Sequence, residues 1–190
     1  MQVLNSLFAK CPIARTMPFP LIVKDRDDSE DLQRFGCKKA KFEGQLDGYK
    51  IAASVDCYDP ANNVVAEVKR FRRRITPSSL SAKLLQLALY YLSVEQTTGK
   101  RPSAYLYIIL PDGSEMRIDV TKYMPLAVAL LRKQLRTPVP LYKHVPCRMC
   151  QYRQAGMCRR RDVPEGYIIN IEFKHAVAEI LEALAVQTAV

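Results

Sequence analysis

The stretch VVAEVK at residues 64–69 predicts a short β-strand, because β-branched residues dominate it. Successive side chains of a strand point to opposite faces, so Glu67 and Lys69 are expected to share one face. The preceding residues 60–63, PANN, have the composition of a tight turn. Together these segments predict the second half of a β-hairpin, with an acidic and a basic side chain on one side of the sheet.

The register of this hairpin also predicts which residue of the preceding strand lies opposite Glu67. With residues 60–63 as the loop, Asp59 pairs with Val64. Three steps further back, Asp56 then lies opposite Glu67, and opposed side chains have Cβ atoms about 5 Å apart. Two carboxylates at that distance repel each other unless a cation lies between them. We therefore predict a divalent metal site between Asp56 and Glu67.

Length and composition are those of a globular domain. The chain has 190 residues, of which 48% are hydrophobic and 25% are charged. No run of 18 apolar residues occurs, so no transmembrane helix is predicted. Residues 1–10 lack a basic stretch followed by a long apolar one, and we therefore expect a cytoplasmic protein.

The net charge of +10 is concentrated in clusters that include residues 69–70, 72–74 and 159–161. Such clusters suit phosphate backbones or anionic membranes, although a solvated surface can have the same composition. The first two clusters adjoin the acidic strand, and this proximity favours a functional interpretation for them.

The rest of the sequence predicts a mixture of helices and strands. The longest helix begins at Thr76, a good N-cap, has Pro77 at its first position and ends at Gly99. Its apolar stripe recurs at helical spacing and consists of Leu80, Leu84, Leu87, Tyr91 and Val94. Further helices are expected at 28–35, 122–136 and 173–186. Two strands are expected within 39–59, with a bend near 47–48, and single strands at 64–70, 104–110, 115–120 and 167–173. Residues 1–23 are expected to form an irregular arm.

Gln86 and Tyr90 lie four residues apart on the long helix, so they share a face beside the apolar stripe. Lys83 lies on the same flank. An amide, a phenol and an ammonium group are therefore expected at the edge between helix and sheet. Helical periodicity by itself also fits a partly buried Tyr90 and a solvated Gln86.

The six cysteines fall into two sets. Cys37 and Cys57 are expected to be buried small apolar residues. The other four, at positions 11, 147, 150 and 158, are candidates for metal ligands rather than disulfides in a cytosolic chain.

Cys147-x2-Cys150 has a spacing typical of zinc or iron–sulfur sites, and Cys158 supplies a third thiolate. The fourth ligand is open at this point. His144 is a local candidate, and with it the segment would form a Cys₃His zinc site.

Three motifs together resemble a known nuclease family. Asp56 followed by Glu67-Val68-Lys69 resembles the PD-(D/E)XK signature, and Gln86-x3-Tyr90 resembles the Q-x3-Y motif of the RecB-like branch. Cys11-Pro12, with the three late cysteines, resembles the iron–sulfur layout of the CRISPR-associated Cas-four exonucleases. The resemblance covers roughly residues 8–160, and the combination is more specific than E-x-K alone.

The resemblance implies an α/β fold, a PD-(D/E)XK restriction-endonuclease-like mixed sheet flanked by helices. Residues 1–140 would form the nuclease core with an N-terminal arm that carries one cluster cysteine. Residues 141–190 would form a Cys-rich C-terminal iron–sulfur module and a terminal helix, packed as one unit with the core.

The resemblance also implies the roles of the site residues. Asp56, Glu67 and the carbonyl of Val68 would bind Mg²⁺ or Mn²⁺, and Lys69 would orient the attacking water or stabilise developing charge. The Gln-x3-Tyr pair would complete the catalytic set. Cys11 would be the fourth ligand of an iron–sulfur cluster, with 4Fe–4S favoured and 2Fe–2S as the alternative.

The implied function is a metal-dependent nuclease that cuts the ends of DNA, preferably single-stranded, as an exonuclease or endonuclease in CRISPR spacer acquisition, alongside integrase proteins. DNA backbone contacts are expected from Arg70, Arg72, Arg73, Arg74 and Lys83. The alternative is a non-catalytic nucleic-acid-binding protein stabilised by zinc or an iron–sulfur cluster. Both a monomer and a homo-oligomer are compatible with the sequence.

Asp47 is a rival for the upstream acid, because Gly44-x2-Asp47 is close to the pattern common in this family. It lies 20 residues before Glu67, more than a single hairpin needs, whereas Asp56 has the better register. RecB-like nucleases often carry a histidine upstream of the acid. The two histidines of this chain both lie downstream, which argues against histidine-assisted or two-metal chemistry.

Overall fold

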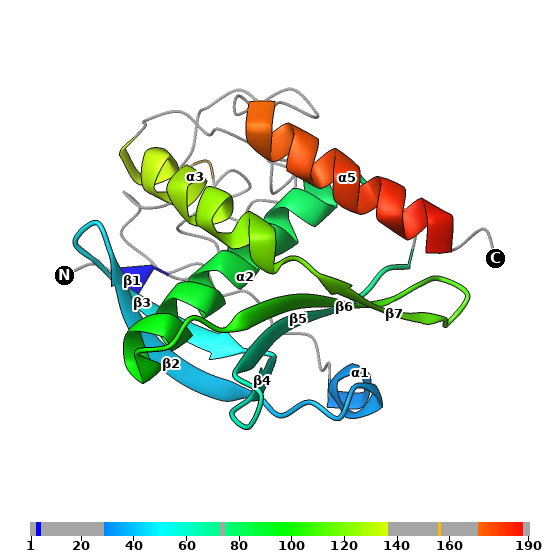
Figure 1. The fold of residues 1–190 in the computed structure, drawn as a ribbon, viewed down its shortest axis with the longest axis horizontal. Coiled ribbons are helices and arrows are strands. Elements are labelled where there is room, and N and C mark those ends of the chain that lie inside the picture. The colour runs from blue at the N-terminus through cyan, green and yellow to red at the C-terminus, as the bar shows by residue number, and fades with distance from the viewer. Residues whose placement is uncertain (1–2, 5–28, 73–74, 137–155, 157–170, 188–190) are drawn as a thin grey trace.

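The computed structural model describes residues 3–4, 29–72, 75–136, 156 and 171–187. These residues form a mixed α/β fold with two sheets, of order β1-β3-β2 and β4-β5-β6-β7 (Figure 1). The strands are Val3–Leu4 (β1), Ala40–Leu46 (β2), Tyr49–Val55 (β3), Cys57–Asp59 (β4), Val64–Arg70 (β5), Ser103–Ile109 (β6) and Glu115–Asp119 (β7).

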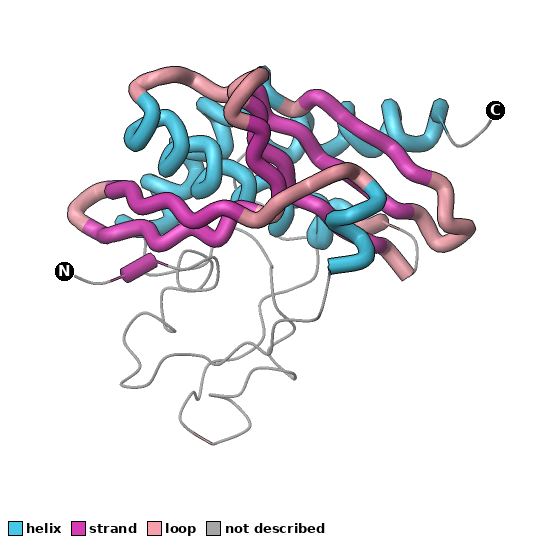
Figure 2. The backbone as a smooth tube through the Cα atoms, turned by 90° about the horizontal axis from the view of Figure 1, so that it is seen from below, coloured by secondary structure: helices cyan, strands magenta, loops and turns pink. Residues whose placement is uncertain are grey.

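The larger sheet is mixed. β5 runs antiparallel to β4 and parallel to β6, and β7 runs antiparallel to β6. A parallel pair needs a long crossover connection, which the helix α2 (Pro77–Thr98) provides. The chain passes from β3 into β4 through one bend residue, Asp56, so the two sheets are joined at that point. Figure 2 shows the strands (magenta) and helices (cyan) from below.

Helices lie on both faces of the larger sheet (Figure 1). α2, α3 (Met124–Arg136) and α5 (Ile171–Gln187) cover the face that contains the main core, and the 3₁₀ turn η2 (Thr121–Tyr123) precedes α3. α1 (Ser29–Arg34) lies on the other face, where Leu32 packs in a smaller cluster with Val68. Because neighbouring residues of β5 point to opposite faces, Glu67 faces α2 whereas Val68 faces the α1 side.

The structure confirms the ends of the long helix. The Thr76 side chain accepts a hydrogen bond from the Ser79 N–H, and the Ser79 side chain accepts one from the Thr76 N–H, which is a capping box. The helix stops before Gly99, whose φ of 71° is readily adopted only by glycine. Every residue of the predicted apolar stripe is buried.

The strand expected at 167–173 is wrong for Ile171–Phe173, which begin α5. The buried residues Phe173, Val177, Ile180 and Leu184 recur at helical spacing along α5. A short apolar run has too few residues to distinguish the two periods, and packing of α5 on α2 and α3 decides the outcome.

Cys37 and Cys57 are buried, as expected, but their sulfur atoms form a disulfide bond. The expectation of two separate small apolar residues is therefore wrong. The segment that follows α1 returns to β4, and this brings together two residues that lie 20 positions apart. No local pattern in the sequence indicates that tertiary contact.

Several predicted residues lie outside the described part of the chain, namely Cys11, Cys147, Cys150, Cys158, His144, Arg73 and Arg74. The same holds for the N-terminal arm except Val3–Leu4, which pairs with β3. No helix in the described ranges is long and apolar enough to cross a membrane. The cytoplasmic location remains a prediction.

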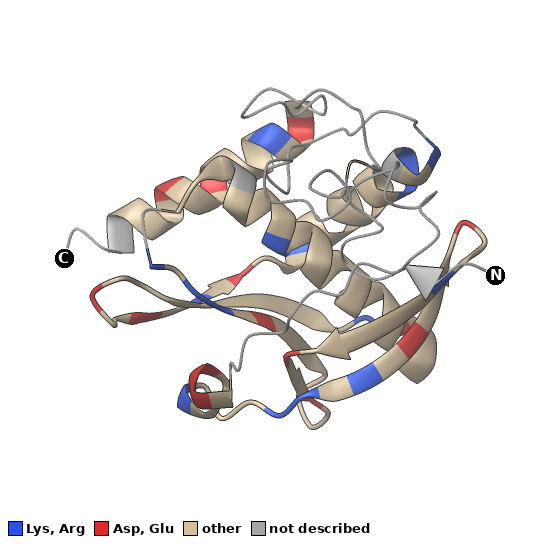
Figure 3. Ribbon diagram, turned by 180° about the vertical axis from the view of Figure 1, so that it is seen from behind, with Lys and Arg blue, Asp and Glu red and all other residues tan. Residues whose placement is uncertain are grey.

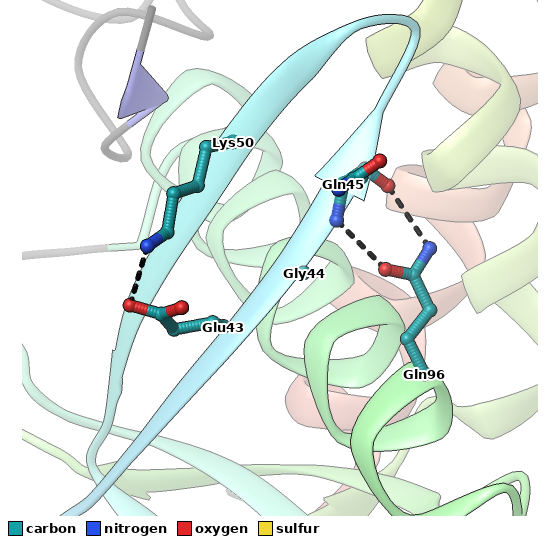
Figure 4. A pocket seen from close by; sticks show the side chains of 5 residues that line it. All are labelled: Glu43, Gly44, Gln45, Lys50 and Gln96. Carbon is teal, nitrogen blue, oxygen red and sulfur yellow. Dashed lines mark hydrogen bonds and ion pairs between the residues drawn. The ribbon is translucent and has the colours of Figure 1, made fainter. Parts of the chain in front are cut away.

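The C-terminal end of α2 covers the outer edge of β2 (Figure 4). The Gln96 side-chain oxygen accepts a hydrogen bond from the Gln45 N–H at 2.7 Å, and its nitrogen donates to the Gln45 carbonyl at 2.9 Å. Gly44 permits this close approach, because a Cβ there would lie 3.1 Å from the Ser93 Cα. A surface pocket of about 470 Å³ lies along the same contact, at the far end of α2 from Lys83.

Replacing Gly44 with valine is expected to lower the free energy of unfolding by about 1–3 kcal/mol, the usual cost of overpacking. The added side chain would collide with the α2 backbone at Ser93, which cannot move without shifting the helix. Urea unfolding followed by circular dichroism measures the change. The control is Ala52→Val on neighbouring β3, where the side chain is exposed and little change is expected. Equal stability of the two variants would contradict the close contact.

Candidate active site

The β4–β5 hairpin brings Asp56 beside β5. Asp59 pairs with Val64, the register that the sequence predicts. The regular ladder stops before Asp56, which lies in the bend between β3 and β4. Its Oδ2 accepts a hydrogen bond from the N–H of Val68 at 3.2 Å. The backbone of β5 therefore holds this carboxyl group next to Glu67.

Glu67 is almost completely buried, with 1% of its surface exposed. Burial of a carboxylate is costly unless partners compensate its charge. The Lys83 ammonium donates a hydrogen bond to Oε1 of Glu67 at 2.5 Å. Oε2 is also buried and has no hydrogen-bond partner among the described residues. One oxygen of Glu67 thus has a positively charged partner, and the other has no hydrogen-bond partner in the described part of the chain.

The Gln-x3-Tyr motif continues from Lys83 along one face of α2. Lys83 donates a hydrogen bond to the side-chain oxygen of Gln86 at 3.0 Å, and the Gln86 nitrogen donates to the Tyr90 hydroxyl at 2.7 Å. Spacings of three and four residues bring these side chains together. The motif therefore lies at the acidic pair, and its amide has a defined orientation because each end has a different partner.

Tyr90 is a buried phenol with 5% of its surface exposed. Burial raises the pKa of its hydroxyl far above the usual range, and the negative charges of Glu67 and Asp56 raise that pKa further. Tyr90 therefore stays protonated at physiological pH. Because its oxygen accepts a hydrogen bond from Gln86, its own proton is available to a second acceptor in the site.

Burial raises the pKa of the Asp56 carboxyl to about 8, and the nearby charge of Glu67 contributes in the same direction. The Val68 N–H and the Lys83 charge oppose the shift without cancelling it. At neutral pH the Asp56 carboxyl therefore tends to hold its proton. A dication placed beside Asp56 would offset the negative charge of Glu67 and lower the Asp56 pKa again, which favours its ionised form.

The acidic pair fits a small divalent metal. Glu67 offers a buried oxygen that lacks a hydrogen-bond partner in the described part of the chain, and the pKa of the Asp56 carboxyl is raised by burial and by the negative charge of Glu67. The described residues contain no cluster of three or more carboxylates, cysteines or histidines. Magnesium is commonly held by one or two carboxylates and keeps several waters, so a pair of acids satisfies its requirements.

The remaining members of the E-x-K element lie on β5. Lys69 is half-buried and follows Glu67 on the same face of the strand. The Val68 side chain is buried on the opposite face. The strand thus separates an apolar contact with the α1 side from the polar residues that face α2.

Asp47 lies at the other end of β3 from Asp56, in the turn that follows β2. Its φ of 48° belongs to the left-handed region, which aspartate tolerates better than most residues. Its carboxylate pairs with Arg136 at 2.8 Å and with Arg132 at 3.8 Å, both on α3. The structure therefore places Asp47 in a contact between the β2–β3 turn and α3.

Arg70 has a partner that the sequence did not predict. Its guanidinium donates two hydrogen bonds to Oδ1 of Asp31 on α1, at 2.9 Å and 2.7 Å. Strand alternation puts Arg70 on the α1 side of β5, away from the side of Glu67. Figure 3 shows the acidic and basic positions of α1 and β5 from behind. Arg72 is exposed beyond the end of the strand.

Lys83 lies on the helix flank that the sequence predicts, but the sequence did not predict its contact with Glu67. The Lys83 ammonium forms an ion pair with Glu67, and its side chain is only 20% exposed. The DNA contact expected of Lys83 stays a prediction. Its spacing of three residues from Gln86 was the available signal. The distance to Glu67 depends on how α2 crosses the sheet, which the sequence pattern does not encode.

Comparisons with protein-family models and with curated proteins give no match. Among solved structures, a candidate exonuclease from Eubacterium rectale has 16% identity and a TM-score of 0.48, over 74% of this chain and 59% of that one. A protein named SSO0001 has 15% identity and a TM-score of 0.46, over 84% of this chain and 87% of that one. This chain thus spans 59% of the length of the first protein. Similarity at this level assigns no activity.

Proposed function

We propose that this protein is a metal-dependent deoxyribonuclease that hydrolyses phosphodiester bonds with Mg²⁺ or Mn²⁺. One observation carries the proposal. The side chain of Glu67 is buried, one of its oxygens lacks a hydrogen-bond partner among the described residues, and the neighbouring Asp56 carboxyl has a pKa of about 8. A divalent cation between the two acids would give Oε2 a partner and would stabilise the ionised form of Asp56, which burial and the charge of Glu67 disfavour.

Asp56 and Glu67 would hold the metal, and the family resemblance adds the Val68 carbonyl as a further ligand. A bound dication supplies positive charge for the phosphate transition state and activates a water for attack. Lys69, on the same face of β5 as Glu67, would orient that water or stabilise developing charge. Tyr90 remains protonated and would donate a hydrogen bond, while Gln86 keeps the phenol in place.

DNA is the proposed substrate because the chain carries a net charge of +10, with arginines directly after the catalytic strand. Exposed Arg72 is the described member of that group, and Arg73 and Arg74 follow it. Contacts of arginine with phosphates set position on the strand rather than base sequence. Single-stranded ends or overhangs are the proposed form of the substrate, in agreement with the family resemblance.

Replacing Arg72, Arg73 and Arg74 with alanine is expected to weaken DNA binding at every sequence. Each lost phosphate contact should reduce the slope of log affinity against log salt by about 0.7 for a single strand, or by about 2 for three contacts. Fluorescence anisotropy in EDTA at several salt concentrations measures this slope. A double variant of Lys100 and Arg101, at the far end of α2, is the control and should keep the wild-type slope. Equal slopes in both variants would contradict the proposed contact.

The resemblance supports a further part of the proposal. Cys11, Cys147, Cys150 and Cys158 would bind an iron–sulfur cluster, 4Fe–4S or 2Fe–2S, and the nuclease would process new spacer DNA alongside CRISPR integrase proteins. The role of the cluster would be structural, because cysteines at positions 11, 147, 150 and 158 would link the start of the chain to its C-terminal part. A brown anaerobic preparation with broad visible absorption is expected, whereas a colourless protein with stoichiometric zinc would favour the His144 alternative.

Cleavage of end-labelled single-stranded DNA tests the activity. Anaerobically purified protein is expected to shorten or nick the labelled strand with Mn²⁺ and to leave it intact in EDTA. Duplex DNA of the same sequence, with and without an overhang, reports the preferred substrate. Tight binding without any metal-dependent cleavage would contradict the proposed enzyme and favour the non-catalytic nucleic-acid-binding alternative.

A further inference from the structure

The two oxygens of the Glu67 carboxylate have different surroundings. Oε1 accepts a hydrogen bond from the Lys83 ammonium at 2.5 Å. Oε2 is buried without a hydrogen-bond partner among the described residues. A cation that reaches this acid therefore meets one oxygen that already has a charged partner and one that does not.

Lys83 is held in this position by its own neighbours on α2. Its ammonium also donates to the Gln86 oxygen at 3.0 Å, and the Gln86 amide is oriented by Tyr90 at 2.7 Å. The side chain is 20% exposed, so most of its surface is in contact with protein. Displacing Lys83 from Oε1 would disturb this hydrogen-bonded row and separate a buried ion pair, which is costly.

The consequence is a restriction on how Glu67 can coordinate a metal. Because Oε1 already accepts a hydrogen bond from a charged donor, coordination of an ion through both oxygens would compete with Lys83, whereas coordination through Oε2 alone would not. Magnesium accepts this arrangement, because it needs near-octahedral geometry with few protein ligands and several waters. Calcium takes six to eight oxygens and uses bidentate carboxylates to reach that number.

We infer that Lys83 is a specificity-determining residue of the metal site, which disfavours Ca²⁺ because its hydrogen bond to Oε1 competes with bidentate coordination through Glu67. The inference rests on the proposed function, since it requires a dication between Asp56 and Glu67. It assigns Lys83 a position inside the acidic site rather than on the DNA-binding surface. Gln86 and Tyr90 then support Lys83 as well as the reaction.

The positive charge of Lys83 weakens the binding of every dication, so a change in the affinity for one ion would not show that Lys83 affects how Glu67 coordinates the metal. Removing a positive charge should strengthen the binding of Mn²⁺ and Ca²⁺ together. A change in the number of Glu67 oxygens available should instead favour the larger ion. The ratio of the two dissociation constants separates these causes.

The test is isothermal titration of the full chain with Mn²⁺ and Ca²⁺ separately, without DNA, for wild type, Lys83→Met and Lys83→Arg. The wild type is expected to bind Mn²⁺ more tightly than Ca²⁺. In Lys83→Met, which lacks a donor, the preference for Mn²⁺ should fall by about tenfold, the scale of changes in groups that orient a metal ligand. Lys83→Arg keeps a donor for Oε1 and should retain a preference near that of the wild type.

Circular dichroism first checks that each variant is folded. Lys83→Gln is made in parallel, because its shorter side chain ends before Oε1 and should also reduce the preference for Mn²⁺. A wild type that binds Ca²⁺ as tightly as Mn²⁺, or an unchanged ratio in Lys83→Met or Lys83→Gln, would overturn the inference and leave the nuclease proposal standing. Absence of binding of either ion to the wild type would overturn both.

Discussion

Replacing Glu67 with glutamine is expected to lower the rate of Mn²⁺-dependent cleavage of single-stranded DNA by more than about 10²-fold, the range for loss of one electrostatic contact in an active site. The variant keeps the shape of the side chain and its contact with Lys83 through a neutral oxygen. It removes the negative charge that we propose for metal binding. Gel analysis of end-labelled DNA under single-turnover conditions measures the rate, and calorimetry with Mn²⁺ should show a parallel loss of affinity.

Asp56 and Asp47 provide a matched pair for the same assay. Asp56→Ala should abolish metal-dependent cleavage, because its carboxyl lies beside Glu67 at the start of β4. Asp47→Ala should retain most of the activity, since its carboxylate pairs with Arg132 and Arg136 of α3 at the other end of β3. The opposite result for the two aspartates would make Asp47 the metal ligand and would reject the site described above.

The second large effect concerns stability and pH. The Asp56 pKa is raised from 3.8 to about 8 by folding, chiefly through burial. Below pH 3.8 the carboxyl is protonated in both the folded and the unfolded protein. Between pH 3.8 and pH 8 the unfolded protein releases this proton while the folded protein keeps it, so the free energy of unfolding should fall as pH rises. Above pH 8 both forms are ionised, and the loss is complete.

The size of this effect follows from about 1.4 kcal/mol for each pKa unit, so several kcal/mol are expected before solvent screening at the half-buried carboxyl is considered. Asp56→Asn cannot ionise and should be more stable than wild type near pH 8, with a smaller difference near pH 5. Urea unfolding in EDTA at a series of pH values measures the free energy of unfolding of both proteins. The difference between the two values cancels the contribution of the other titrating groups.

Asp112→Asn serves as a control of opposite sign. Hydrogen bonds from Ser114 lower the pKa of the Asp112 carboxyl, so its contribution to stability is present above its unfolded pKa and is lost as the pH falls.

Saturating Mn²⁺ should stabilise the wild type more at pH 8 than at pH 5, because the metal favours ionised acids. A difference between wild type and Asp56→Asn that does not change with pH would contradict the raised pKa.

Local patterns were sufficient for much of the site. The turn residues 60–63 and the β-branched run after them predicted the Asp59–Val64 register, which the structure contains. Thr76 and Gly99 predicted the ends of α2, and the spacing of Gln86 and Tyr90 predicted their shared face. These features depend on backbone preferences and side-chain periods within a few residues, and such information is present in the sequence itself.

Contacts between distant segments required the folded chain. The Cys37–Cys57 disulfide, the pairing of Arg70 with Asp31 and the pairing of Lys83 with Glu67 join different elements. The sequence by itself determined the hairpin, the long helix and the residues available for chemistry. Only the tertiary structure decided which oxygen of Glu67 has a partner, because that depends on how closely α2 crosses β5, and crossing geometry is the joint result of packing across the whole core.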